Sequence, residues 1–456
     1  MKPQNILIIS CYFPPQPSVA SLRPYFFAKY WKKMGNNITI LTAEKRSSGV
    51  DLDFPIHNFE VITAPFINII HEGGEILKKL FKYTDHVRSQ VSEISPEEQV
   101  NSNNSFSYVN IKKAWLRFAR KRGLFVTARI PDIYDLWAYS AVKKGHELLK
   151  TKSYDWIVSS YGPPASHIAA GILSKTYQCR WVADYRDLWI ENHIYRGMWP
   201  FTIFEKYMEK KYVGHHANVI TTVSEPLANI LRRKFNNPVF VIENGYDDEE
   251  YDVESPPYFS DQKIRIIYTG NIYPEKRNPS PLFAAIADLA TKDTNMRQRM
   301  SDQFEVLFFG NENDWLNQLI IKYGVQSWVK YMGKVNRIDA LRIQKQADLL
   351  LFLEWGDESV DGILTGKLFE YLAARKPIIG IGISPSSAAG ILMCQAGVGQ
   401  AVGEDLDKVT SILRKLITEN KPFVIQPREE VINKYTRRKQ AEFLLHIMNK
   451  YSVISG

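Results

Sequence analysis

The chain has 456 residues, of which 45% are apolar and 23% are charged, and it carries a formal net charge of +9. This length exceeds what one hydrophobic core usually supports, so two large ordered domains are expected and a long disordered chain is excluded. The three cysteines are scattered, which excludes a disulfide framework and favours the cytoplasm. A membrane span is not predicted, because the sequence lacks an apolar run of roughly 18 residues. The positive net charge favours an anionic partner.

The first half of the chain repeats the order strand, helix, strand. Residues 5–10 form an apolar run that predicts a strand, residues 23–34 show a helical pattern, and residues 38–42 predict a second strand. Such a unit is right-handed and has parallel strands. Further strands are expected at 156–159, 181–183 and 219–222, and helices at 136–149, 165–175, 201–212 and 225–235. The pattern therefore predicts an N-terminal doubly wound domain over residues 1–246.

Residues 66–130 interrupt this order and are expected to form an insertion. Within it, residues 111–122 hold six basic side chains and no acidic one, and Ile111, Trp115 and Phe118 fall on one helical face. Two interpretations remain open. The helix either packs its aromatic side on the domain core or makes a peripheral contact with an anionic membrane.

The strand and helix order begins again after an acidic stretch at residues 247–261. Strands are expected at 264–268, 306–309, 329–332, 349–353 and 377–381. This spacing is typical of a second doubly wound domain, which we place at 247–430. Residues 431–456 are predicted to form a helical segment that packs back on the N-terminal domain.

The first candidate site is a loop that follows a strand, since ligands of open parallel sheets bind beyond the carboxyl ends of the strands. Gly270 and Asn271 follow the strand at 264–268, and Lys276 and Arg277 come shortly after. Glycine lets a backbone approach closely, and the cations can neutralise phosphate. The loop predicts a diphosphate site, with a plain glycine turn as the alternative.

A second candidate site begins the helix that follows the strand at 349–353. Backbone N–H groups at a helix start can bind an anion, and a carboxylate one turn further can accept two ribose hydroxyls. Capping by a threonine is the structural alternative, but it does not explain a lysine and a glutamate together. The residues concerned are Gly362, Ile363, Leu364, Thr365, Lys367 and Glu370.

The N-terminal domain offers two further candidates. His167 lies in the first turn of a helix after a Gly-Pro-Pro loop and is expected to face the ligand cleft. A contact with a sugar and a structural role weigh equally for it. Arg186 lies between Asp184 and Asp187, where an internal ion network is favoured over binding of hydroxyl groups.

Taken together, these segments resemble the GT-B glycosyltransferases of family 4, especially the bacterial group 1 enzymes with an Arg-Asp-x-Trp motif. The resemblance covers most of the chain, and the order of the motifs through both domains carries it. The matching segments are residues 12–15 (Tyr-Phe-Pro-Pro), 131–137, 162–167, 184–189, 221–224, 244–245, 270–276 and 367–373.

The resemblance implies an α/β enzyme with two Rossmann-like domains that face each other across a cleft. It implies a retaining transfer of the hexosyltransferase type, without metal or cofactor, from a UDP- or GDP-linked sugar. Carried over by position, Lys276 contacts the diphosphate, Glu370 the ribose, residues 362–365 the sugar and phosphate, and His167 the transferred sugar.

The resemblance also implies partners and a location. The acceptor is expected to be a glycan, a lipid-linked sugar or another glycoconjugate, at the inner face of the cell membrane in the cytoplasm. No nucleic-acid partner is expected, because no binding motif accompanies the charge.

Two positions and one loop depart from the family pattern, the loop being residues 16–21, which lack the family's glycine. Asn271 stands where the family often carries arginine, and Gly362 stands where it has the first of two paired glutamates. These departures keep two alternatives open. One is an enzyme similar to nucleotide-sugar 2-epimerases, and the other is a nucleotide-binding scaffold without turnover.

Overall fold

The computed structural model describes residues 2–44, 52–66, 129–130, 132–192, 197–252, 256–274, 276–353 and 364–453. The chain divides into two compact units. The N-terminal unit comprises residues 1–222, 227–241 and 445–456, and the C-terminal unit comprises 223–226 and 242–444. Of the insertion expected at 66–130, only residues 66, 129 and 130 belong to the described part. The basic helix predicted at 111–122 lies outside it.

The N-terminal unit is built on a seven-stranded sheet in the order β3-β2-β1-β4-β5-β6-β7, whose described strand pairs are all parallel. Its strands are β1 Asn5–Ser10, β2 Asn37–Ala43, β3 Glu60–Ala64, β4 Trp156–Ser160, β5 Arg180–Tyr185, β6 Val219–Thr222 and β7 Val239–Val241. Apolar runs form these strands because helices cover both faces of a parallel sheet. Ile6 to Ile9 of β1 are accordingly at most 1% exposed.

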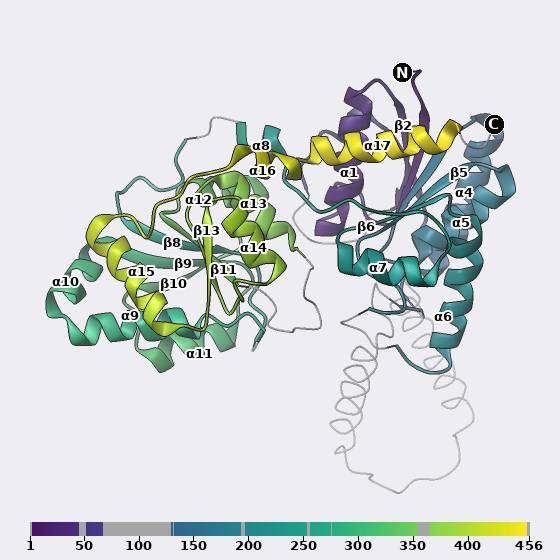
Figure 1. Ribbon diagram of the computed structural model, residues 1–456. Helices are drawn as coiled ribbons and strands as arrows, with labels where there is room; N and C mark the ends of the chain where they lie inside the picture. Colours follow the sequence, from purple (N-terminus) through teal and green to yellow (C-terminus); the bar gives the residue numbers. More distant parts are fainter. Residues whose placement is uncertain are drawn as a thin grey trace, which may run out of the picture. The chain divides into compact units, whose positions relative to one another are not determined.

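Helices alternate with these strands (Figure 1). They are α1 Leu22–Lys33, α4 Asp135–Thr151, α5 Ala165–Tyr177, α6 Phe201–Glu209 and α7 Glu225–Lys234, with short turns at Val19–Ser21 and Ile56–Asn58. The helix expected at 201–212 ends earlier, and a π-helical turn at Lys210–Gly214 follows it. No described helix has the length and apolar character needed to span a bilayer.

The C-terminal unit repeats this architecture on a six-stranded sheet in the order β10-β9-β8-β11-β12-β13, again with parallel described pairs. Its strands are β8 Ile264–Thr269, β9 Phe304–Phe309, β10 Val329–Gly333, β11 Leu349–Leu353, β12 Ile378–Ile381 and β13 Gly399–Gly403. The five strands expected from the apolar runs are present. β13 was missed, because its sequence of glycine, glutamine and alanine lacks an apolar run.

Helices cover both faces of this second sheet (Figure 1). They are α8 Asp248–Asp252, α9 Ser280–Lys292, α10 Thr294–Gln303, α11 Asp314–Tyr323, α12 Arg337–Lys345, α13 Gly366–Ala374, α14 Ala388–Gln395, α15 Leu406–Glu419 and α16 Glu429–Ile432, with a short turn at Asn433–Tyr435. Alternate β11 residues enter opposite cores: Leu351 packs on one side of the sheet and Phe352 on the other. The prediction of two Rossmann-like α/β domains is confirmed.

The last helix, α17 Arg437–Val453, ends among N-terminal unit residues. Ser452 Oγ accepts a hydrogen bond from Trp156 Nε1 at 3.0 Å, and Arg180 Nη2 donates to the Ser452 carbonyl at 2.8 Å. These contacts join the end of the chain to β4 and β5.

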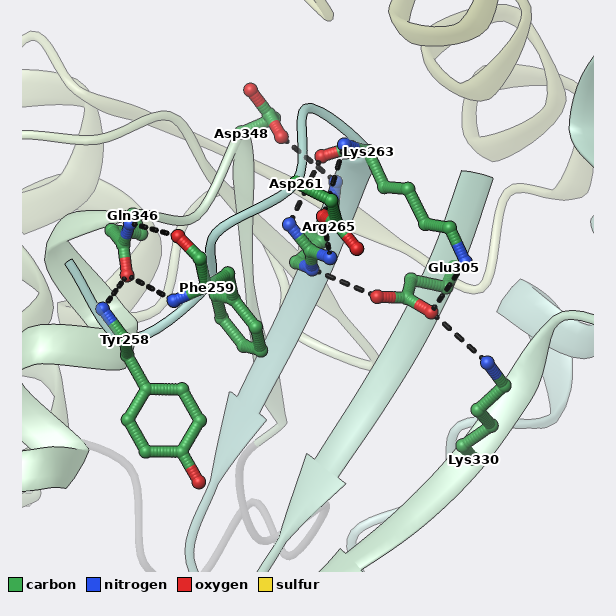
Figure 2. Close-up of polar contacts among 9 residues, drawn as sticks. All are labelled: Tyr258, Phe259, Asp261, Lys263, Arg265, Glu305, Lys330, Gln346 and Asp348. Carbon is green, nitrogen blue, oxygen red and sulfur yellow. Dashed lines mark hydrogen bonds and ion pairs between the residues drawn. The ribbon is translucent and has the colours of Figure 1, made fainter. Parts of the chain in front are cut away.

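A polar cluster holds the amino ends of the strands in the C-terminal unit (Figure 2). Arg265 Nε donates to Glu305 Oε1 at 2.8 Å, and Lys330 Nζ donates to Glu305 Oε2 at 3.1 Å. The backbone N–H of Arg265 donates to Asp348 Oδ2 at 2.8 Å. The cluster therefore links β8, β9, β10 and the start of β11 at the edge opposite to their carboxyl ends, where ligands of such sheets bind.

Candidate functional site

The strand order of the C-terminal unit reverses between β8 and β11, which are neighbours in the sheet. Crevices outside the carboxyl ends of strands form at such a point. Gly270 follows β8 directly, and α13 is the helix that follows β11 along the chain. The two loops predicted from the sequence are therefore brought to the same place in the sheet.

Gly270 occupies a backbone conformation that favours glycine, with φ of +125°. A Cβ atom built on it would lie 2.8 Å from Lys367 Nζ, so any larger residue would displace the lysine. The end of β9 also approaches closely, because a Cβ atom on Gly310 would lie 2.3 Å from the Gly270 carbonyl oxygen. Gly270 thus leaves room for the lysine, and Gly310 leaves room for the backbone of Gly270.

Lys367 Nζ is buried and has no hydrogen-bond partner among the described residues. It lies 3.7 Å from the centroid of the Tyr268 ring, a favourable cation–π position. Burial lowers the pKa of the Lys367 ammonium well below its usual range, the charge of Arg277 lowers it further, and Glu370 opposes the shift. A buried ammonium without an acceptor is costly, so an anion brought to this position would be bound strongly.

The loop after β8 is held by its own polar contacts. Arg277 Nη1 donates to the Asn271 carbonyl at 3.1 Å, and Tyr268 Oη donates to the same oxygen at 3.0 Å. The Asn271 side chain accepts from the Asn311 backbone N–H at 3.2 Å. Asn271 therefore organises the loop, and Arg277, next to the exposed Lys276, brings a cation near Lys367.

The start of α13 has the backbone of a helix N-terminus. Thr365 takes the extended N-cap conformation, but its side chain makes no capping hydrogen bond. Capping by this hydroxyl, the structural alternative, is therefore not what the structure shows. Leu364 packs against the core of the unit. Gly362 and Ile363 lie outside the described residues, and their assignment stays a prediction.

Glu370 lies one turn further along α13 and is held in an ionic network. Arg337 Nη1 donates to Glu370 Oε1 at 2.7 Å, while Glu250 accepts from Arg337 Nε and Nη2, each at 2.7 Å. Gln344 Nε2 lies 3.5 Å from Glu370 Oε2 and donates to Thr269 Oγ1 at 2.9 Å. The carboxylate is thus fixed from the side of α12.

Sequence reasoning missed Arg337, Gln344 and Glu250. The first two are seven residues apart on α12, a spacing that places both on one helical face, and this is the signal that could have found them. Glu250 gave no signal, because its partner lies 87 positions further along the chain.

The structure places His167 in the interior of the N-terminal unit rather than at a surface. Its side chain is 0% exposed and packs against the rings of Tyr185 and Trp181. Its Nδ1 lies 2.7 Å from Ser159 Oγ. Burial lowers the pKa of the imidazole to about 3. The charge of Asp184 opposes this shift, and the charge of Arg186 reinforces it. The aromatic core therefore encloses the ring in this structure, and the assignment of His167 beside a sugar stays a prediction.

The Arg-Asp-x-Trp segment is an internal network, as the sequence favoured. Asp184 accepts two hydrogen bonds of 2.8 Å from Arg23, which the sequence reasoning missed. Arg186 donates to the carbonyl of Tyr161 at 2.6 Å and of Gly162 at 3.0 Å. These contacts hold the loop before α5 in place.

The outer face of α6 is a further feature of the N-terminal unit. Glu205 and Glu209 point inward and are 0% exposed, paired with Arg129 and Lys234 respectively. The aromatic and aliphatic side chains instead face outward. These exposed residues are Ile203 at 59%, Phe204 at 48% and Tyr207 at 59%, and Trp199, two residues before the helix, is 75% exposed. In an ordinary surface helix the apolar side chains face the core and the charged ones face water, so the distribution on α6 is reversed.

Comparison with known proteins relates the chain to enzymes of sugar transfer. A family model described as Glycosyltransferase Family 4 matches residues 110–250. No curated protein sequence matches the chain. Solved structures align over nearly the whole length, at low sequence identity.

Three of these structures illustrate the likeness. HepE from Anabaena, solved in complex with UDP, aligns with a TM-score of 0.58 at 12% identity, over 98% of this chain and 100% of that chain. The lipopolysaccharide outer core galactosyltransferase WaaB gives 0.53 at 12%, over 98% and 99%. A UDP-N-acetylglucosamine 2-epimerase gives 0.53 at 13%, over 98% and 97%. These alignments show the GT-B fold.

Proposed function

We propose that this glycosyltransferase, whose fold is GT-B and whose residues 110–250 match family 4, takes its sugar from a nucleoside diphosphate donor bound in the C-terminal unit. One observation carries the proposal: the Lys367 ammonium is buried without a hydrogen-bond partner among the described residues, beside Gly270. A diphosphate would supply the missing acceptors, and the N-terminus of α13 adds backbone N–H groups.

The nucleotide of the donor is proposed to be UDP or GDP. The complex of HepE with UDP, in a protein of the same fold, favours UDP for the first trial. Glu370 would accept the ribose hydroxyls, Lys276 and Arg277 would add charge near the phosphates, and residues 362–365 would reach the sugar. No cofactor beyond this donor substrate is proposed.

The transfer is proposed to retain the anomeric configuration and to need no metal. The bond between the anomeric carbon and the β-phosphate oxygen breaks, an acceptor hydroxyl oxygen bonds to that carbon, and its proton passes to the departing diphosphate, on which negative charge grows. Preorganised cations at that position lower the barrier by favouring the charged leaving group. Lys367 and Arg277 would supply these cations, and the two side chains are close enough to interact. His167 has no role in this scheme beyond holding the core of the other unit.

The acceptor is proposed to be a glycan or a lipid-linked sugar at the inner face of the cell membrane, as part of polysaccharide synthesis. The basic segment 111–122 supports a peripheral contact by its composition. The outward aromatic side chains of α6 support it independently, since tryptophan and tyrosine favour the boundary between lipid and water.

Calorimetric binding of UDP, GDP, ADP and CMP tests the donor site. We expect wild type to select one diphosphate nucleotide and Lys367→Met to weaken its binding by at least about tenfold, since a charged hydrogen bond contributes roughly 1.5–3 kcal/mol. Lys415→Met, which removes an exposed lysine of α15, is the matched control. Unchanged binding in Lys367→Met would contradict the proposal.

Two alternatives give different results. An epimerase would convert the nucleotide sugar without any acceptor, whereas a transferase needs one, so product analysis in the absence of acceptor separates them. A scaffold would bind the nucleotide and release no product with any acceptor. The match of residues 110–250 to a glycosyltransferase family favours the transferase.

A further inference from the structure

Three charged side chains from three helices meet beside the proposed donor site. Glu250 comes from α8, Arg337 from the first position of α12, and Glu370 from α13. Arg337 joins the two carboxylates with three hydrogen bonds of 2.7 Å. All three side chains are largely covered, at 20%, 16% and 22% exposed for Arg337, Glu250 and Glu370. We call these residues the carboxylate clamp.

The guanidinium of Arg337 makes more hydrogen bonds to one carboxylate than to the other. Two of its nitrogen atoms, Nε and Nη2, bind both oxygens of Glu250, and only Nη1 binds Glu370, through Oε1. A planar guanidinium bound at two points by one carboxylate has a fixed orientation. Glu250 therefore sets the direction of Nη1, and Nη1 in turn holds one oxygen of Glu370.

The second oxygen of Glu370 is engaged more weakly. Its described hydrogen-bond contact is Gln344 Nε2 at 3.5 Å, beyond the usual length of such a bond. Tyr251 Oη donates to the backbone carbonyl of Glu370 at 2.8 Å, which fixes the helix at this residue. The carboxylate is thus anchored by one oxygen and its backbone, while the other oxygen keeps most of its capacity to accept.

Lys367, three residues earlier on α13, is a second cation that interacts with Glu370. The two groups interact, since Glu370 opposes the fall in the pKa of Lys367. A Glu370 carboxylate that turned to Lys367 would satisfy that ammonium and compete with a phosphate for it. The hydrogen bond from Arg337 Nη1 to Glu370 Oε1 would oppose such a turn.

We propose that Arg337 is a positioning residue, held by Glu250, that fixes Glu370 through one oxygen so that the other accepts the ribose hydroxyls of the donor. The proposal rests on the proposed function, because it assumes that Glu370 faces a ribose. It assigns Arg337 no contact with the nucleotide. The guanidinium acts only through the orientation of the carboxylate.

A comparison of two nucleotides tests the clamp. Dissociation constants of UDP and 2′,3′-dideoxy-UDP are measured by calorimetry for wild type, Arg337→Met, Arg337→Lys and Glu370→Gln, or with the guanosine pair if wild type selects GDP. Wild type should prefer the nucleotide with hydroxyls by about tenfold or more. Arg337→Met should lose most of this preference, while its affinity for the dideoxy nucleotide changes less than about twofold.

The matched control is Arg414→Met, which removes an arginine of the same unit from an exposed ion pair with Asp293. It should keep the preference. Arg337→Lys should recover only part of it, because an ammonium cannot bind Glu250 at two points and Glu370 at a third. Should Arg337→Met fail to fold, Glu250→Gln loosens the same guanidinium from outside and should lower the preference in the same direction.

The outcomes separate the two proposals. If wild type binds no nucleotide, the proposed function fails. If wild type shows the ribose preference and Glu370→Gln removes it, but Arg337→Met keeps it, the proposed function stands and the clamp is wrong. An equal loss of affinity for both nucleotides in Arg337→Met would also overturn the clamp, because a general structural role would act on both.

Discussion

At the scale of single residues, Lys367 shows how burial prepares a side chain for an anion. Its ammonium is removed from water, lies on the Tyr268 ring and has no acceptor among the described residues. Such a group loses its proton more readily than an exposed lysine. A diphosphate at this position would restore the preference for the charged form. Protonation and nucleotide binding should therefore be coupled.

The coupling predicts the pH dependence of nucleotide binding. The pKa of Lys367 is lowered in the free protein and would be raised by the bound diphosphate, so binding takes up a proton at any pH between the two values. Affinity for UDP should then fall as the pH rises through this window. Above about pH 7 the terminal phosphate of UDP is already ionised and contributes little.

Calorimetry in two buffers of different ionisation enthalpy measures this uptake directly. Wild type should show a net gain of protons on binding UDP at pH values where the terminal phosphate is already ionised, and Lys367→Met, which has no ammonium to titrate, should show less. The same proton uptake in both proteins would show that another group is responsible.

His167 illustrates the opposite outcome of burial. It is enclosed by aromatic rings, and its imidazole stays neutral because burial lowers the pKa to about 3. We expect His167→Ala to destabilise the N-terminal unit by about 2 kcal/mol or more, since it leaves a cavity in a packed core and removes one of the hydrogen-bond partners of Ser159.

Thermal unfolding and UDP binding together check this expectation. The unfolding temperature of His167→Ala should fall, while its affinity for UDP should stay within about twofold of wild type, because the proposed nucleotide site belongs to the other unit. A variant with an unchanged unfolding temperature but no transferase activity would instead support the role beside the sugar that the family resemblance implies.

At the scale of elements, α6 reverses the usual distribution of side chains. Its inward glutamates are held by ion pairs, so the helix docks through charge and leaves aromatic groups outside. Lys206 and Lys210 are exposed on the same segment. Aromatic side chains combined with lysines fit the boundary of an anionic bilayer.

This arrangement predicts binding to lipid. The double variant Phe204→Ser and Tyr207→Ser should reduce co-sedimentation with vesicles that contain an anionic phospholipid, by about tenfold if both rings enter the lipid. Its unfolding temperature should not fall, since both side chains are exposed. The double variant Ile321→Ser and Ile338→Ser, at exposed positions of the C-terminal unit, is the control. Equal sedimentation of wild type and the α6 variant would rule out this contact.

The sheets of both units show how local patterns set an element and how distant residues hold its ends. The apolar run of β8 predicts a buried strand, and the strand is found at Ile264–Thr269. Its amino end is fixed by Glu305 and Asp348, which come from later parts of the chain (Figure 2). Its carboxyl end is followed by Gly270 instead. The missing side chain of this glycine leaves space for Lys367.

At the scale of the whole molecule, the order of strands along the chain determines where chemistry can occur. Each unit has a parallel sheet whose strand order reverses once near its middle. In the C-terminal unit this reversal brings the loop after β8 to the start of α13. The family match lies at residues 110–250, so most of the proposed nucleotide site is outside the matched stretch and is argued from its own contacts.

Local patterns in the sequence were enough to predict the two doubly wound domains, the strands formed by apolar runs and the loops at their carboxyl ends. It could do so because periodicity and glycine placement are local properties of the chain. β13 was missed because only Val402 of its five residues is buried, so it shows no apolar run.

Only the tertiary structure decided which polar side chains meet. The contact of Arg337 with Glu370 joins residues 33 positions apart, and that of Arg23 with Asp184 joins residues 161 apart. It also decided that His167 is enclosed while Lys367 lacks a hydrogen-bond acceptor within the described part of the chain. Burial and pairing depend on packing between elements, and the physical reason is that desolvation is set by all the atoms around a group, whichever part of the sequence supplies them.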